Sequence, residues 1–178
     1  MQKLNEIITG IEEEYPDLSF FRINRENIKY YSESFKMCEA NACGCFKTNW
    51  ACSAEAAGQR KLYERVKAYK KAAVFIYKYK LADNYDWTSM KLALENFGKL
   101  CRTIQDELKK SGINSLVLGA GACSLCGTCT YPEKPCRHPE LLIYPLEAAG
   151  IYAYSLLDGT NNKTPGGERE YIGLIAYN

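Results

Sequence analysis

The sequence predicts a single domain of the α/β or α+β class, in which a small mixed sheet is flanked by helices and carries a cysteine-rich loop region. Three observations predict it. The chain has 178 residues, a length that suits one domain over residues 1–178 and is large enough to bury a core. Helix-type and strand-type hydrophobic patterns alternate along it, and two groups of cysteines fall in segments that have neither pattern.

Helix and strand patterns alternate in the N-terminal half. Apolar residues at helical spacing predict an amphipathic helix over residues 2–14, and the run 18–23 predicts a strand. A further strand is predicted at 28–31. From about Glu55 the pattern is helical again, and β-branched and aromatic residues then predict a strand within 72–79, although a helix continuing through this segment fits the same residues.

The clearest helix is predicted over residues 87–111. Asp86 or Thr88 can cap its start, and Gly112 stands where a left-handed residue commonly ends a helix. Its apolar side chains step alternately by four and three positions and form one stripe, made of Met90, Leu94, Phe97, Cys101, Ile104 and Leu108.

The C-terminal third mixes strands with short helical pieces. Residues 116–118 predict a buried strand, and residues 171–177 predict a terminal strand. Between them, residues 140–157 fit two short helical pieces that are broken near Gly150, and a polar loop follows over 158–168.

Charge and hydropathy argue against several function classes. The net charge of +2 is too close to neutral to predict a nucleic-acid partner. No run reaches the roughly 20 apolar residues of a membrane span, and the N-terminus lacks the apolar region of a secretory signal, so we expect a cytoplasmic protein with no membrane partner. Basic residues concentrate at 60–80, a pattern more typical of a solvated helix face than of a binding surface.

The most specific motif is a cysteine triplet, Cys123, Cys126 and Cys129, at the spacing C-x2-C-x2-C. The chain has nine cysteines and no secretory signal, which favours free thiols that bind metal over disulfides. This spacing lets one loop present each sulfur to a different iron of a 4Fe-4S cluster, as in bacterial ferredoxins. The small residues in the motif leave backbone amides free to approach the sulfurs. Cys136 is the candidate fourth ligand, with a more distant cysteine as the alternative.

A second group consists of Cys38, Cys43, Cys45 and Cys52, at the spacing C-x4-C-x-C-x6-C. Cys101 lies on the apolar helix stripe, so we assign it to the core. The other cysteines then form two groups of four, which suits one or two 4Fe-4S clusters. Zinc is the alternative, because cysteine pairs drawn from both groups supply four sulfurs, although a third cysteine at the x2 interval is then superfluous.

Two side chains beside Cys136 are weaker candidates. His138 is the single histidine and can ligate metal or donate a proton, yet a solvated loop histidine is the commoner case. Arg137 can bind an anion or a carboxylate of a partner. No Ser–His–Asp set or Cys–His pair can be assembled with conviction from one histidine, so the sequence leaves open whether the protein is an enzyme.

Three segments carry a resemblance to a known family. They are GACSLCGTCTYPEKPCRHPE at 121–140, PLEAAGI at 145–151 and FKTNWAC at 46–52. Together they are similar to the cysteine-rich "predicted metal-binding protein" family of unknown function from anaerobic bacteria and archaea, over about residues 30–177.

The resemblance implies metal and supplies no reaction. The family usually reads Tyr-Gly-Lys-Asn-Trp-Ser-Cys-Pro-Pro in its upstream segment, so Lys47 replaces a glycine and Ser53 with Ala54 replaces two prolines, while Cys45 is an additional thiol. The metal ligands that the resemblance implies are Cys38, Cys43, Cys52, Cys123, Cys126, Cys129 and Cys136.

The leading hypothesis is an iron–sulfur protein that passes single electrons to or from a redox partner protein. The basic run at 60–80 would steer an acidic partner, and Trp50, Tyr131 and Tyr144 would limit the access of solvent. Two alternatives are a structural zinc-binding interaction module that presents a basic helix, and a cluster-dependent enzyme that uses an open iron site.

Overall fold

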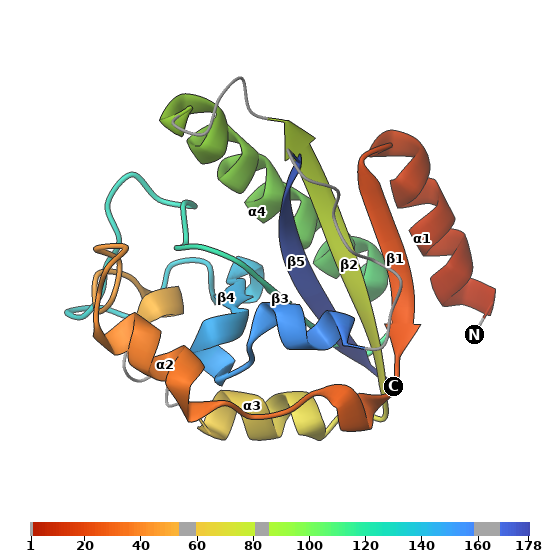
Figure 1. Ribbon diagram of the computed structural model, residues 1–178, viewed down its shortest axis with the longest axis horizontal. Coiled ribbons are helices and arrows are strands. Elements are labelled where there is room, and N and C mark those ends of the chain that lie inside the picture. The colour runs from red at the N-terminus through yellow and green to blue at the C-terminus, as the bar shows by residue number, and fades with distance from the viewer. Residues whose placement is uncertain (1, 54–59, 81–85, 159–167) are drawn as a thin grey trace.

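A mixed β-sheet of five strands lies at the centre of the part of the protein that the structure describes (Figure 1). The structure is a computed structural model, and it describes residues 2–53, 60–80, 86–158 and 168–178. Within these ranges the strands are β1 (Leu18–Ile23), β2 (Lys71–Lys80), β3 (Ser115–Gly119), β4 (Tyr144–Pro145) and β5 (Glu168–Tyr177). The α-helices are α1 (Gln2–Glu14), α2 (Ser32–Glu39), α3 (Arg60–Lys67) and α4 (Trp87–Lys110). None of these described helices is both long enough and apolar enough to cross a bilayer.

The strands follow the order β1-β2-β5-β3-β4, and all neighbours are antiparallel except β3 and β4. The two longest strands, β2 and β5, pair along their whole length. Leu118 of β3 lies opposite Tyr144 of β4 in the parallel pair, so the chain between them must cross back to the other end of the sheet. The predicted α/β class with a mixed sheet flanked by helices is confirmed.

Helices cover both faces of the sheet, because the buried side chains of each strand alternate between two clusters. Val74 of β2 belongs to a cluster with residues of α2 and α3, whereas the next residue, Phe75, packs with α1 and α4 on the opposite face. A strand that is buried on both faces needs apolar residues at nearly every position, as the inner part of β2 has. Four members of the predicted stripe of α4 are fully buried in the second cluster, namely Phe97, Cys101, Ile104 and Leu108.

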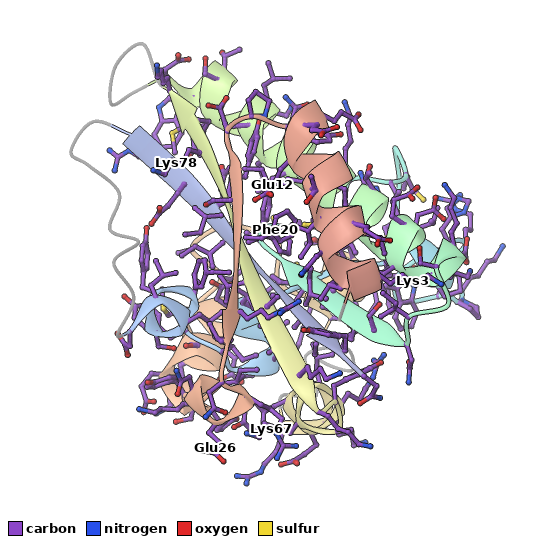
Figure 2. All side chains as sticks on the ribbon, turned by 90° about the vertical axis from the view of Figure 1, so that its right-hand side faces the viewer. Lys3, Glu12, Phe20, Glu26, Lys67 and Lys78 are labelled. Atoms are coloured by element: carbon purple, nitrogen blue, oxygen red, sulfur yellow. The ribbon has the colours of Figure 1, made fainter. Side chains whose placement is uncertain are left out.

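Helix α1 packs along the edge strand β1. Leu4 and Ile11 are buried beneath the helix, which holds its acidic residues on the outer side. The Glu12 carboxylate accepts a hydrogen bond from the backbone N–H of Phe20 at 3.3 Å (Figure 2). Because β1 lies at the edge of the sheet, this contact satisfies an amide on the side where no further strand pairs.

The structure confirms most of the predicted elements. The helices predicted at 2–14 and 87–111 and the strands predicted at 18–23, 116–118 and 171–177 are present, with end points that differ by up to three residues. The basic segment at 60–80, whose pattern fitted either a helix followed by a strand or one continuous helix, divides into two elements. Helix α3 ends at Lys67 and strand β2 begins at Lys71.

The short helical pieces predicted at 140–157 are 3-10 turns. Two of them, Leu146–Ala149 and Ala153–Leu157, lie on either side of Gly150, which has a φ of 66°. This left-handed backbone ends the first turn and favours glycine. The predicted start of the helix near Glu55 and most of the polar loop at 158–168 lie outside the described residues.

The strand predicted at 28–31 is wrong. This segment follows a 3-10 turn at Arg25–Asn27 and leads into α2 without pairing with any described strand. Its residues bind a loop and a helix instead, because the N–H of Tyr31 donates to the Gly150 carbonyl at 2.7 Å and the hydroxyl of Tyr63 on α3 donates to the Ile28 carbonyl at 3.0 Å. The apolar and aromatic residues that suggested a strand therefore anchor a loop to the core.

Asp86 caps the start of helix α4, and the alternative cap, Thr88, lies inside the helix. The Asp86 carboxylate accepts a hydrogen bond from the N–H of Ser89 at 3.0 Å. We expect Asp86→Ala to lower the free energy of unfolding by about 1 kcal/mol, measured by urea denaturation, because it removes this cap. Thr88→Ala is the control and is expected to stay within about 0.5 kcal/mol, since alanine is the better helix former. Equal losses in the two variants would contradict the assignment.

Candidate metal centre

The second cysteine group lies in the crossover that joins β3 to β4. This connection, residues 120–143, contains no α-helix and no strand, and its only regular piece is a 3-10 turn at Pro139–Leu141. Connections between parallel strands are usually helical, so an irregular crossover of this length needs another source of order. The loop lies beside the segment that follows α2, at one side of the molecule (Figure 1).

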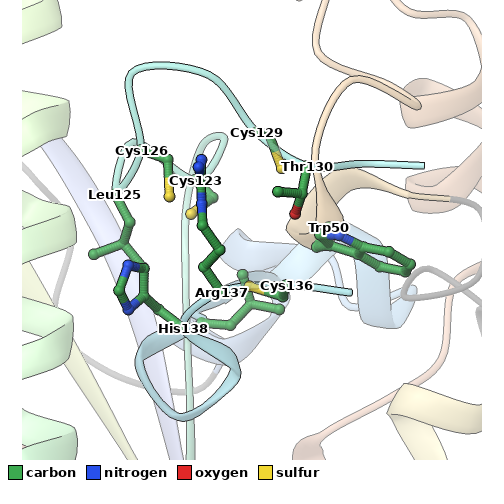
Figure 3. A pocket seen from close by; sticks show the side chains of 10 residues that line it. Trp50, Cys123, Leu125, Cys126, Cys129, Thr130, Cys136, Arg137 and His138 are labelled. Carbon is green, nitrogen blue, oxygen red and sulfur yellow. The ribbon is translucent and has the colours of Figure 1, made fainter. Parts of the chain in front are cut away.

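All four thiols of this group line one cavity (Figure 3). Cys123, Cys126, Cys129 and Cys136 surround a space of about 20 Å³, which is the size of one water molecule. All four are free and partly exposed. Cys136 therefore lies with the triplet, and no distant cysteine lines this described cavity, while its role as the fourth ligand stays a prediction.

Backbone amides in this loop are available to sulfur. Within the described chain, residues 122–129 donate no backbone-to-backbone hydrogen bond. The Leu125 N–H lies near the sulfur of Cys123 and favours its thiolate form. Burial raises the pKa of the Cys123 thiol, and the neighbouring Cys136 and Cys126 raise it further, while the Leu125 amide and Arg102 act in the opposite direction. Amide donors of this kind stabilise a thiolate and tune a metal that it ligates.

The first cysteine group gathers around the end of α2. Burial raises the pKa of Cys38 to about 11, with the charges of Glu147 and Cys43 adding to the effect. Burial likewise raises the pKa of Cys52 to about 12, and this thiol also interacts with Cys45, Cys38 and Cys43. The four thiols therefore share one electrostatic neighbourhood.

Local structure in this group is set by an asparagine and a strained lysine. The buried Asn49 side chain accepts hydrogen bonds from the N–H groups of Ala51 and Cys52, both at 3.1 Å, and so caps the 3-10 turn that carries Cys52. Lys47 has a φ of 58°, a left-handed backbone that favours glycine. This conformation explains physically why a glycine suits that position in the resembling family.

Trp50 joins the two cysteine groups. It belongs to the first segment, yet its ring lines the cavity of the second group (Figure 3). The indole N–H donates to the Lys134 carbonyl at 3.1 Å, and the ring meets Tyr131 edge to face at 5.1 Å between centroids. Trp50 therefore stands beside the thiols as expected, whereas Tyr131 packs on Trp50 without lining their cavity and Tyr144 lines a different cavity.

Arg137 and His138 both line the thiol cavity. The guanidinium of Arg137 reaches across it and donates a hydrogen bond to the Thr128 carbonyl (Figure 3). His138 stands at the rim and is exposed. A cation thus already sits among sulfurs that become negative when they lose their protons.

The donor set suits a thiolate-bound metal. Thiolates are the ligands that zinc and iron–sulfur clusters prefer, and each group supplies four thiols with no disulfide. Across the described residues, no three His, Cys, Asp or Glu side chains yet stand close enough to hold an ion together. A metal held by either group would therefore require its thiols to change position. Cys101 is excluded from this set, because it is fully buried in the core behind α4, as predicted.

Sequence reasoning missed two residues of this region. Glu147 lies close enough to Cys38 to act on its charge, and burial raises the pKa of this carboxyl above its usual range. The signal in the sequence was a single acidic residue in the apolar run PLEAAG. The second missed residue is Asn49, three positions before Cys52, and its signal was that asparagine before a short turn is a common cap.

Comparison with known proteins supports metal binding and gives neither the identity of the metal nor a reaction. No curated protein and no solved structure matches the chain. One family model, described as Predicted metal-binding protein (DUF2284), matches residues 22–175, which include both cysteine groups and Trp50. The chain therefore belongs to this predicted metal-binding protein family.

Proposed function

We propose that the protein is an iron–sulfur protein, with one or two 4Fe-4S clusters, that passes single electrons to or from a partner protein. The observation that carries the proposal is the second cysteine group, in which four free thiols line one cavity and the Leu125 amide favours the thiolate form of one of them. A bound cluster would supply one-electron chemistry. The eight thiols of the two groups suit two clusters by number.

The surrounding residues have defined tasks in this proposal. Cys123, Cys126, Cys129 and Cys136 would hold the cluster of the second group, and the Leu125 amide would stabilise the negative sulfur of Cys123. Trp50 would exclude water from one side of it. Cys38, Cys43, Cys45 and Cys52 would hold the second cluster. Free, partly exposed thiols suit the reducing cytoplasm of an anaerobe.

An acidic protein is the partner that we propose. Arg60, Lys61 and Arg65 are exposed on α3, and the one acid among them, Glu64, pairs with Arg60 at 3.4 Å. Such a surface accelerates encounter with an acidic partner, and the acceleration falls as salt is added.

A structural zinc site is the second candidate, and the size of the cavity favours it. A space of about 20 Å³ suits a single ion once the thiols draw in to ligate it, whereas a cluster would require the thiols and Arg137 to move outward. In this case the metal would stabilise the crossover and the exposed basic side of α3 would bind a partner.

Metal analysis of anaerobically purified protein separates the two candidates. The iron–sulfur proposal predicts a brown protein with broad absorption near about 400 nm, and about four iron and four sulfide per chain for one cluster or about eight of each for two. The same preparation after chelation is the colourless control. A colourless protein that holds zinc in stoichiometric amount, with no sulfide, would overturn the proposal in favour of the second candidate.

A further inference from the structure

A second and larger cavity lies next to the metal centre. Its volume is about 390 Å³, within the range of roughly 300–1,000 Å³ that small-molecule sites occupy. It is bounded by the second half of α4, the start of β3, the 3-10 turn at Pro139–Leu141 and Tyr144 of β4. Neither cysteine group lines it.

The charges around this cavity favour an anion. Three cations line it, namely Arg65, Arg102 and Lys109, against the two acids Asp106 and Glu140. Asp106 is already paired with Lys110, which lies outside the cavity, at 2.8 Å. The three cations come from two different helices, with Arg65 on α3 and Arg102 and Lys109 on α4.

Part of the cavity wall is apolar. Leu116 and Leu142 are each only 8% exposed and lie at its base, and Ile113 lines it too. Tyr144 adds an aromatic face, with the guanidinium of Arg65 at 5.8 Å from its ring centroid. An apolar base below convergent cations fits a molecule that has both a carbon body and a negative group.

Two contacts relate this cavity to the cysteine site. Leu142 lines both cavities, and the charge of Arg102 acts on the thiol of Cys123. A ligand in the larger cavity would therefore lie one side chain away from the thiols.

We propose that this cavity binds a small organic carboxylate whose apolar body lies on Leu116, Leu142 and Tyr144 and whose carboxylate is bound by Arg102 and Lys109, with Arg65 closing over it. Binding itself does not depend on metal. That the ligand lies beside a metal centre rests on the proposed function.

The test uses 3-phenylpropionate as the probe, followed by two-dimensional amide NMR of the full chain without metal. We expect saturable shifts at the amides around Leu116 and Leu142, with a Kd on the order of 1 mM or tighter for a ligand of this size. The uncharged 3-phenylpropionamide and inorganic phosphate are each expected to bind at least about tenfold more weakly, because the first lacks the charge and the second lacks the apolar body. No shifts, or equal binding of either comparison compound, would overturn the proposed ligand class.

Variants locate the site. Arg102→Met and Lys109→Met are each expected to weaken binding of 3-phenylpropionate about tenfold, since each removes a charged hydrogen-bond donor. Lys99→Met is the matched control, because Lys99 is exposed on the same helix and does not line the cavity. Lys109 is exposed, so its replacement tests the site even if Arg102→Met misfolds. Equal affinities in Lys109→Met and Lys99→Met would place the probe elsewhere and refute the site.

Metal content of the same variants separates this proposal from the proposed function. Wild type and Lys109→Met should carry equal metal after anaerobic purification, because Lys109 is not near the thiols. Binding of the probe to a protein that never takes up metal would leave the carboxylate site standing and refute the metal centre alone. Metal uptake without probe binding would refute the carboxylate site alone.

Discussion

Cys126→Ala is expected to abolish metal binding at the second cysteine group. Cys126 is the middle thiol of the triplet and lines the cavity with the other three, so its loss leaves three sulfurs for a centre that needs four. Metal content should fall by about four iron per chain for a 4Fe-4S cluster, or by one zinc. Because ligation energy is also folding energy, the stabilisation that metal gives should fall by about 4 kcal/mol or more, measured as the difference in urea denaturation between loaded and chelated protein.

Cys101→Ala is the matched control for this experiment. The substitution is the same, but this thiol is buried in the core, where its sulfur packs against Gly119 and the ring of Phe97 also lies close to that glycine. We expect full metal content and a packing loss of about 1 kcal/mol. Loss of metal in Cys101→Ala, or its retention in Cys126→Ala, would show that the cysteines are wrongly divided between site and core.

Gly173→Ala is expected to destabilise the centre of the sheet by about 3 kcal/mol. Gly173 of β5 lies opposite Phe75 of β2, and an added Cβ would overlap the Phe75 ring. The ring cannot easily move aside, because Phe20 and Phe97 pack around it at 5.7 and 5.6 Å between centroids. Overpacking of a rigid core lowers the free energy of unfolding, which urea denaturation measures.

Two further variants test the cause of this loss. Gly10→Ala makes the same change at an exposed position of α1 that has nothing within 4 Å, and it should stabilise the protein by about 1 kcal/mol through helix propensity. Phe75→Leu combined with Gly173→Ala should cost less than the sum of the single changes, because the smaller side chain leaves room for the added methyl group. Strict additivity would show that the ring is not the obstacle.

The long helices and strands of this fold were predictable, because the side that each of them buries in the core is also the side on which its apolar residues repeat. The stripe of α4 was found at Phe97, Cys101, Ile104 and Leu108, which the structure buries against the sheet. The error at 28–31 has the opposite origin, since a loop that packs on the core also needs apolar residues. Strand β4, only two residues long, leaves no period to detect, and its parallel pairing with β3 depends on the whole crossover.

The cysteine groups were predictable by spacing, whereas their surroundings were not. Ligand spacing is a local property of the chain, so Cys123, Cys126 and Cys129 stand out in the sequence. The contact of Trp50 with the second group, and the effect of the Glu147 charge on Cys38, join residues far apart in the chain. Only the folded sheet brings these pairs together, and no local pattern encodes them.

The cysteines of the second group also bear on how the crossover from β3 to β4 is ordered. Where parallel strands are joined by a helix, that helix supplies its own hydrogen bonds and an apolar face, and so orders the connection without outside help. Residues 120–143 contain no helix, so a bound metal would supply part of the order that a helix gives elsewhere. The 3-10 turn at Pro139–Leu141 is held to α4 by the hydrogen bond from Gln105 to the Glu140 carbonyl, and it could assemble with the sheet and helices without metal. The segment that bears the sulfurs, residues 123–136, would then take its final form last, when metal binds.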